Sequence, residues 1–162
     1  MAFEEIIKNA YEESENNCRF GDKLEEITAI QDYIKNSEKI YIPNKNGIKV
    51  EVLNGVLKEY GLPTAKILQI NTNAADASRI PALAKAYMAL DQSDADLIIA
   101  RGRLGVPGSG SFLIFMDNKG RILTAGTSPS HVVHNKTLEE AVYNEANEAL
   151  IKIGFKKVKE WK

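Results

Sequence analysis

The region from Asp94 to His131 constrains the fold more than any other, because it alternates apolar runs with loop-forming residues. Two apolar runs, 96–100 and 112–116, flank a segment rich in glycine. The tetrapeptide Asp117-Asn118-Lys119-Gly120 is typical of a hairpin turn and leads into a third strand over 121–125. This order of strand, glycine-rich loop, strand, turn and strand predicts a sheet with a hairpin in the middle of the chain.

The rest of the chain mixes helical and strand patterns. Apolar residues recur at helical spacing in five segments: 3–14, 24–34, about 50–60, 80–88 and 138–153. The expected helix caps are Asp22 with Glu25, then Asp76 or Ser78, and finally Thr137 with Glu140. Strands are predicted over 39–42 and 66–70, with an edge strand over 155–161. We therefore expect a single α/β domain over residues 1–162, with a mixed sheet flanked by helices.

Charge and cysteine content exclude several classes of protein. The formal net charge is −1, so the arginines of the glycine-rich segment are local features and do not indicate a nucleic-acid surface. The single cysteine, Cys18, cannot form an intramolecular disulfide and fits a reducing cytoplasm. No apolar run reaches the roughly 18 residues that span a bilayer, and the acidic N-terminus is not typical of a signal peptide. We expect a cytoplasmic protein without a nucleic-acid or membrane partner.

The glycine-rich segment is the first candidate for ligand binding. It contains Arg101, Gly102, Arg103, Gly108, Ser109, Gly110 and Ser111. Glycine allows backbone N–H groups to approach an anion closely, and arginine adds charge-assisted hydrogen bonds. The segment is neither a Walker loop, which would end in Gly-Lys-Ser/Thr, nor a Rossmann fingerprint, which would lead into a helix. The alternative is an exposed connection with two solvated arginines.

A second polar loop, Asn71-Thr72-Asn73, lies between a predicted strand and a predicted helix, with Asp76 just beyond it. In an α/β sheet, loops at the carboxyl ends of strands gather at the ligand crevice, and a helix N-terminus favours phosphate. The alternative is an extended capping loop. Both interpretations stay open from the sequence.

The loop after the third strand contains Thr127, Ser128 and His131. His131 suits a ligand contact or a proton donor. With His134 it has the spacing of two metal ligands on one helix face, but no cysteine or nearby carboxylate completes a zinc site. The carboxylates that remain available for magnesium on a nucleotide are Asp76, Asp94 and Asp96.

Two segments carry a resemblance to a known family: QINTNAADASRIP and ARGRLGVPGSGSFLIFMDNKGRILTAGTSPSHVVH. The chain, from Phe3 to its C-terminus, resembles the HcgB family of methanogenic archaea, the guanylyltransferases of iron–guanylylpyridinol (FeGP) cofactor biosynthesis. The resemblance implies a homodimer with a fold of the inosine-triphosphate pyrophosphatase type. It also implies transfer of GMP from GTP to the hydroxyl of a substituted pyridinol, with release of pyrophosphate and with magnesium on the GTP. The product belongs to the cofactor of Fe-hydrogenase.

The residues fit that chemistry, because attack of a pyridinol oxygen on the α-phosphorus needs alignment and charge neutralisation more than a protein nucleophile. The catalytic candidates are therefore Arg101, Arg103 and His131, and the remaining polar loop residues are candidates for nucleotide and substrate binding. Two alternatives stay open. One is a nucleoside-triphosphate pyrophosphatase on the same fold, in which water replaces the pyridinol. The other is a non-enzymatic sensor of a small anion or nucleotide.

Overall fold

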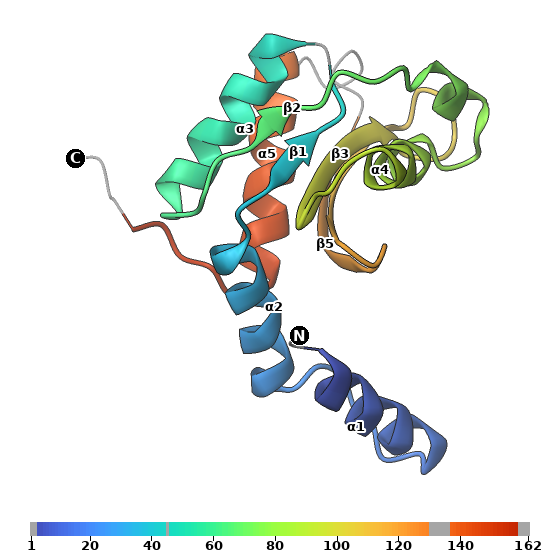
Figure 1. Ribbon diagram of the computed structural model, residues 1–162, viewed down its shortest axis with the longest axis vertical. Helices are drawn as coiled ribbons and strands as arrows, with labels where there is room; N and C mark the ends of the chain where they lie inside the picture. Colours follow the sequence, from blue (N-terminus) through green and yellow to red (C-terminus); the bar gives the residue numbers. More distant parts are fainter. Residues whose placement is uncertain (1–2, 45, 130–136, 159–162) are drawn as a thin grey trace.

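The computed structural model describes residues 3–44, 46–129 and 137–158 (Figure 1). Its elements follow the chain in this order: α1 (Glu4–Glu15), α2 (Leu24–Asn36), β1 (Ile40–Ile42), α3 (Gly47–Glu59), β2 (Lys66–Ile67), the 3₁₀ helix η1 (Asn73–Ala77), α4 (Pro81–Asp91), β3 (Leu97–Arg103), β4 (Gly110–Asp117), β5 (Ile122–Pro129) and α5 (Leu138–Lys152). The expected α/β class is therefore confirmed.

One five-stranded mixed sheet has the strand order β2-β1-β3-β4-β5. The strand β1 pairs in parallel with β2 and with β3, whereas β3, β4 and β5 form an antiparallel ladder. The predicted hairpin turn between β4 and β5 is confirmed, since an Asp117 carboxylate oxygen accepts the backbone N–H groups of Lys119 and Arg121 at 3.0 and 2.8 Å. The carboxyl ends of the parallel strands lie at one edge of the sheet, which is where α/β proteins place their ligand crevice.

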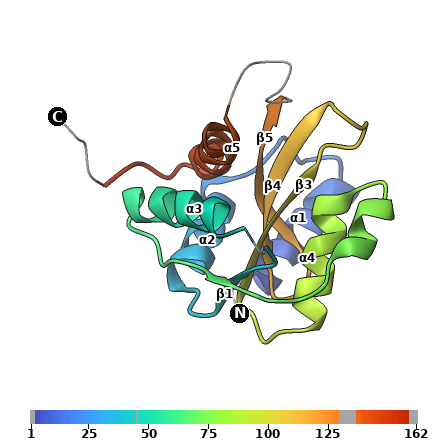
Figure 2. The same ribbon diagram turned by 90° about the horizontal axis from the view of Figure 1, so that it is seen from above.

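Helices cover both faces of the sheet (Figure 2). The helices α3 and α5 pack on one face and α4 packs on the other. Alternate residues of β3 divide accordingly: Leu97 and Ile99 belong to the core under α3 and α5, and Ile98 and Ala100 to the core under α4. The approach is close on the α4 side, because a Cβ on Gly102 would lie 2.5 Å from the backbone nitrogen of Ala82.

Several strands and helices begin or end away from the predicted positions. The first three residues of the supposed loop, 101–103, belong to β3, and its last two, 110 and 111, begin β4. The ladder likewise continues through 126–129, which were predicted as a loop, so Thr127 and Ser128 lie in β5. The antiparallel pairing can continue through these polar residues because the hydroxyls of Ser111 and Ser128 find a partner in the Glu145 carboxylate.

The second helix has a different cap from the predicted one. The prediction of Asp22 with Glu25 was wrong: the cap is Lys23, whose backbone N–H donates to the Glu26 carboxylate at 2.8 Å. Asp22 instead accepts from Arg19 at 3.3 Å. The last helix begins as predicted, with the Thr137 hydroxyl accepting the Glu140 N–H at 3.1 Å.

Three smaller predictions were also inaccurate. The helix α3 begins at Gly47, capped by the Asn46 side chain, and not near Val50. The strand β2 covers only Lys66–Ile67, because the backbone then turns toward η1. Residues 155–158 form no strand, and the rest of that predicted edge strand lies outside the described residues.

Candidate nucleotide site

A cavity of about 190 Å³ lies at the carboxyl ends of the parallel strands. It is lined by residues that follow β1 and β2 and by residues of α3, α4 and β3: Pro43, Asn44, Lys49, Ile70, Thr72, Asn73, Lys85 and Arg101. The first two follow β1 directly, Ile70 and Thr72 lie between β2 and η1, and Asn73 begins η1. These residues are far apart in the sequence, and the fold brings their side chains together around one cavity.

Three of these side chains are cationic. Lys49 comes from the first turn of α3, Lys85 from α4 and Arg101 from β3. Burial lowers the pKa of Lys49 below its ordinary value, and the charges of Arg101 and Lys85 lower it further, against an opposing effect of Glu145. Among the ion pairs of the described residues none involves Lys49, and Lys85 has only the exposed Asp76 at 4.0 Å. The cavity therefore has an excess of positive charge that would favour an anion.

Arg101 is held by a buried carboxylate. Its Nε donates to Glu145 Oε1 at 2.7 Å and its Nη2 donates to Glu145 Oε2 at 3.1 Å. Nη2 also donates to the Ser111 hydroxyl at 2.6 Å. Ser111 and Ser128 both donate to Glu145 Oε2, the former at 2.6 Å. The carboxylate comes from α5 and is fully buried. A fork-to-carboxylate pair of this kind fixes the plane of the guanidinium group.

Part of the predicted site is brought together here. Arg101, Thr72 and Asn73 line the cavity, and Ser111 and Ser128 hold the carboxylate that binds Arg101.

The remaining predicted residues lie elsewhere. Arg103 donates to the backbone carbonyl of Ser78 at 3.0 Å, Asn71 accepts the Asn73 N–H at 2.9 Å, and Thr127 is exposed. The Ser109 hydroxyl donates to two carbonyls of its own turn, and its glycine neighbours, Gly108 and Gly110, have positive φ and do not line the cavity. Gly102 packs against α4. His131 lies outside the described residues.

Sequence reasoning missed Asn44, Lys49, Lys85 and Glu145. A lysine on an amphipathic helix has the pattern of a solvated face, so neither lysine carries a signal of its own. Glu145 does carry one, because it lies three residues after Val142 and next to Ala146, inside the buried stripe of the last helix. A carboxylate at such a position requires a partner in the core.

The carboxylates considered for magnesium have different surroundings. Asp94 pairs with Lys39 at 2.6 Å, and Asp96 accepts the backbone N–H groups of Glu38 and Lys39. Asp76 is exposed and close to Lys85 at the side of the cavity. Across the described ranges no group of three His, Cys, Asp or Glu side chains is arranged for a metal ion.

The chain is an α/β protein whose mixed sheet carries a cavity with cationic side chains at the carboxyl ends of its parallel strands, which is where α/β proteins usually hold ligands. A family model described as FeGP cofactor biosynthesis protein HcgB, guanylyltransferase, matches residues 3–155. The chain belongs to this family, and the resemblance noted from its motifs is confirmed. No helix in the described part of the chain has the length and apolar character of a membrane span. The likeness to the inosine-triphosphate pyrophosphatase fold stays a prediction.

Proposed function

We propose that this protein transfers GMP from GTP to the hydroxyl of a substituted pyridinol and releases pyrophosphate. The observation that carries the proposal is the convergence of Lys49, Lys85 and Arg101 on one cavity, in a chain of a guanylyltransferase family. Glu145 offsets the charge of Arg101, so the two lysines give the cavity its net positive charge, which favours an anionic phosphate chain. The family's guanylyltransferase description supports a nucleotide substrate, and the choice of GTP and a pyridinol is part of the proposal.

The phosphates and the rest of the nucleotide would occupy different parts of the surface. About 190 Å³ is small for a whole ligand, since ligand sites usually enclose about 300 Å³ or more. A second, open groove of about 470 Å³, lined by Ile67, Gln69, Ile70 and Asn71, shares Ile70 with the cavity. We assign the phosphates to the cavity and the base or the pyridinol to this groove.

In this mechanism the pyridinol hydroxyl gives up its proton to solvent and its oxygen attacks the α-phosphorus directly. The bond from the α-phosphorus to the α,β-bridging oxygen breaks, and pyrophosphate leaves on the opposite side. Lys49 and Lys85 hold the phosphates, and Arg101 stabilises the charge that moves onto the leaving group. Magnesium on the phosphates would supply further charge neutralisation. Asp76, which lies 4.0 Å from Lys85, would hold it.

The function is tested by incubating the protein with GTP and magnesium, with and without a dihydroxypyridine as the pyridinol probe. Pyrophosphate released only when the probe is present supports the transfer. Pyrophosphate and GMP from GTP alone indicate a pyrophosphatase. A protein that binds GTP without turnover would be a sensor, and the proposed transfer would be wrong.

The lowered pKa of Lys49 predicts proton uptake when a polyphosphate binds. The free site holds this lysine at a pKa below its ordinary value, and an anion beside it raises that pKa again. At a pH between the pKa of Lys49 in the free protein and its pKa in the complex, binding takes up protons. The affinity for inorganic triphosphate should therefore fall as the pH rises toward the ordinary lysine pKa of 10.5. Calorimetry in buffers of different ionisation enthalpy measures this uptake.

Lys49→Gln should abolish most of the proton uptake and flatten the dependence of affinity on pH. Lys58→Gln is the matched control, because Lys58 lies on the same helix but does not line the cavity. Equal proton uptake by the wild type and by Lys49→Gln would remove Lys49 from the phosphate site.

We also propose a homodimer, formed through the N-terminal helical hairpin of α1 and α2. In Figure 1, α1 stands away from the sheet, and none of its residues is buried. Phe20, between the two helices, has 95% of its surface exposed, and Leu24, at the start of α2, has 82%. Large apolar side chains exposed together to this extent mark an interaction surface. A second copy of the chain would cover them.

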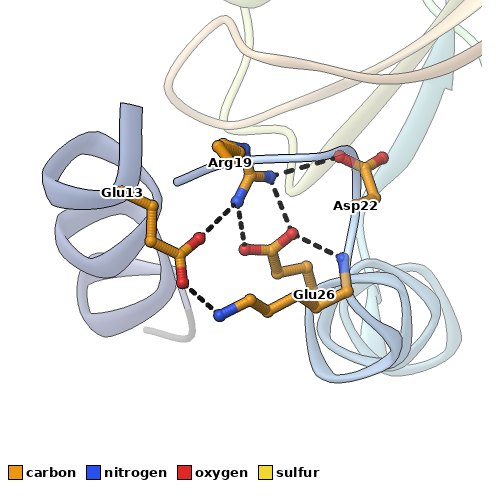
Figure 3. Close-up of polar contacts among 5 residues, drawn as sticks. Glu13, Arg19, Asp22 and Glu26 are labelled. Atoms are coloured by element: carbon orange, nitrogen blue, oxygen red, sulfur yellow. Dashed lines mark hydrogen bonds and ion pairs between the residues drawn. The ribbon is translucent and has the colours of Figure 1, made fainter. Parts of the chain in front are cut away.

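Arg19 links the two helices of the hairpin, and Lys23 adds a second ion pair to Glu13 (Figure 3). Arg19 donates to Glu13 of α1 at 3.0 Å and to Glu26 of α2 at 2.7 and 2.9 Å, with Asp22 at 3.3 Å. The hydrogen bonds from Arg19 lower the pKa of Glu26 to about 2. Because that pKa is below its unfolded value, the contribution is present near neutral pH and is lost only as the pH falls toward the lowered value. Phe20 follows Arg19 directly, so these contacts fix the backbone next to the exposed phenylalanine.

Light scattering should give the wild type twice the single-chain mass of 17.9 kDa. The double variant Phe20→Ser, Leu24→Ser should give the single-chain mass and keep the circular dichroism of the folded wild type, because neither side chain contributes to the core. Val106→Ser, at another exposed apolar residue, is the control and should stay dimeric. A monomeric wild type would contradict the dimer, and a dimeric double variant would place the interface elsewhere.

A further inference from the structure

Glu145 is a fully buried charged residue directly behind the wall of the cavity. We propose that Glu145 is a positioning residue for the transfer reaction, which orients Arg101 toward the phosphates without touching the substrate itself. This inference rests on the proposed function and adds to it a residue that neither the motifs nor the family description assigns.

Arg101 keeps unused hydrogen-bond donors on the side of the cavity. A guanidinium group has five N–H donors. Arg101 uses its Nε donor and both Nη2 donors on Glu145 and Ser111. The two donors of Nη1 form no hydrogen bond with any described residue, and the side chain lines the cavity. Glu145 thus occupies one side of the fork and leaves the other side for a phosphate.

The Glu145 carboxylate is held in one orientation by its own hydrogen bonds. Oε1 accepts from Arg101 Nε, while Oε2 accepts from Arg101 Nη2 and from the hydroxyls of Ser111 and Ser128. These four hydrogen bonds, three of them on Oε2, hold the carboxylate in its plane. The backbone of Glu145 is also fixed, because it lies directly against Gly126 of β5. The guanidinium plane therefore has one orientation before any ligand arrives.

The same contacts exclude a more direct role. A general base must come within hydrogen-bond distance of the proton that it removes. Glu145 has no exposed surface, and its oxygens are already occupied by three side chains. It therefore acts through Arg101. Because misplacement of a group by about 1 Å can cost roughly 100-fold in rate, loss of this support should reduce turnover more than GTP binding.

Glu145→Gln tests the role with a side chain of nearly the same shape. The amide NH₂ of the glutamine would replace one of the two carboxylate oxygens. In either orientation it faces an N–H donor of Arg101, so one of the two hydrogen bonds between Arg101 and residue 145 is lost. We expect the kcat for pyrophosphate release to fall by roughly 10- to 100-fold, with the GTP dissociation constant changed by much less. Glu145→Asp, which keeps the charge but is shorter, should recover part of the loss.

Thr124→Val is the matched control for packing. The Thr124 hydroxyl donates to the backbone carbonyl of Ala149 at 2.7 Å, which is another buried β5–α5 hydrogen bond without contact to Arg101. It should lower the melting temperature while keeping kcat. A readout that does not need turnover is the ¹H–¹⁵Nε resonance of Arg101, which should be protected from exchange in the wild type and in Thr124→Val but not in Glu145→Gln.

The double variant Arg101→Lys, Glu145→Gln decides whether the two residues act as a unit. If Glu145 works through Arg101, the double variant should be little slower than Arg101→Lys alone. If the rate loss of the double variant equals the product of the two single losses, the positioning role is overturned while the transfer stays intact. The same holds if the kcat of Glu145→Gln equals that of Thr124→Val. A wild type that releases no pyrophosphate with the dihydroxypyridine would instead overturn the proposed function and this inference with it.

Discussion

Arg101→Lys is expected to lower the rate of pyrophosphate release by roughly ten- to a thousandfold, the range for loss of one oriented charge-assisted donor in a transition state. Arginine uses one side of its fork on Glu145 and Ser111 and still has Nη1 for the ligand. The lysine ammonium is a single point that cannot satisfy the buried carboxylate and also reach a phosphate in a fixed plane. Because the charge is kept, GTP affinity should change less than turnover.

Arg103→Lys is the comparison within the same strand. Arg103 donates to a backbone carbonyl, that of Ser78, which is a contact that an ammonium can copy. Its effect on turnover should therefore be the smaller of the two. Steady-state kinetics with GTP and a dihydroxypyridine, together with the melting temperature of each variant, separates loss of chemistry from loss of fold. If Arg101→Lys keeps wild-type turnover, Arg101 does not contact the reacting phosphates.

The antiparallel half of the sheet was predictable because its signals are local. The turn at 117–120 and the cap at Thr137 are short patterns that need no knowledge of the rest of the chain. The parallel half was not predictable in the same way. The strand β1 lies between β2 and β3, although β2 comes between them in sequence. Such an order depends on how helices pack over the sheet, which the spacing of apolar residues does not specify.

The candidate site shows the same division between local and long-range information. Arg101 was identified from its place after an apolar run, and Thr72 and Asn73 from their place between a strand and a helix. Lys49 could not be identified, because its importance arises only when α3 brings it beside Arg101 and Lys85. Gly108 and Gly110 were predicted to bind ligand because the segment is rich in glycine, yet their positive φ is a sufficient reason for glycine at these positions.

Gly126→Ala is expected to destabilise the protein by about 3 kcal/mol or more, at or above the upper end of the usual range for overpacking. A Cβ at this position would lie 1.8 Å from the backbone carbonyl oxygen of Glu145 and 2.9 Å from the nitrogen of Ala149. Both are backbone atoms of α5, so no side-chain rotation can relieve the contact. The helix must move away from β5, which would also displace Glu145 and lower turnover in the variant that remains folded.

Gly55→Ala gives a control with the opposite sign. Gly55 lies inside α3, and a Cβ there would meet no atom within 4 Å. Alanine in place of glycine within a helix should stabilise the protein by about 0.5–1 kcal/mol. Urea unfolding of both variants, compared at equal m-value, measures the two free energies. A Gly126→Ala protein as stable as the wild type would show that α5 does not lie this close to β5, and the fixed placement of Glu145 behind Arg101 would then lose its structural basis.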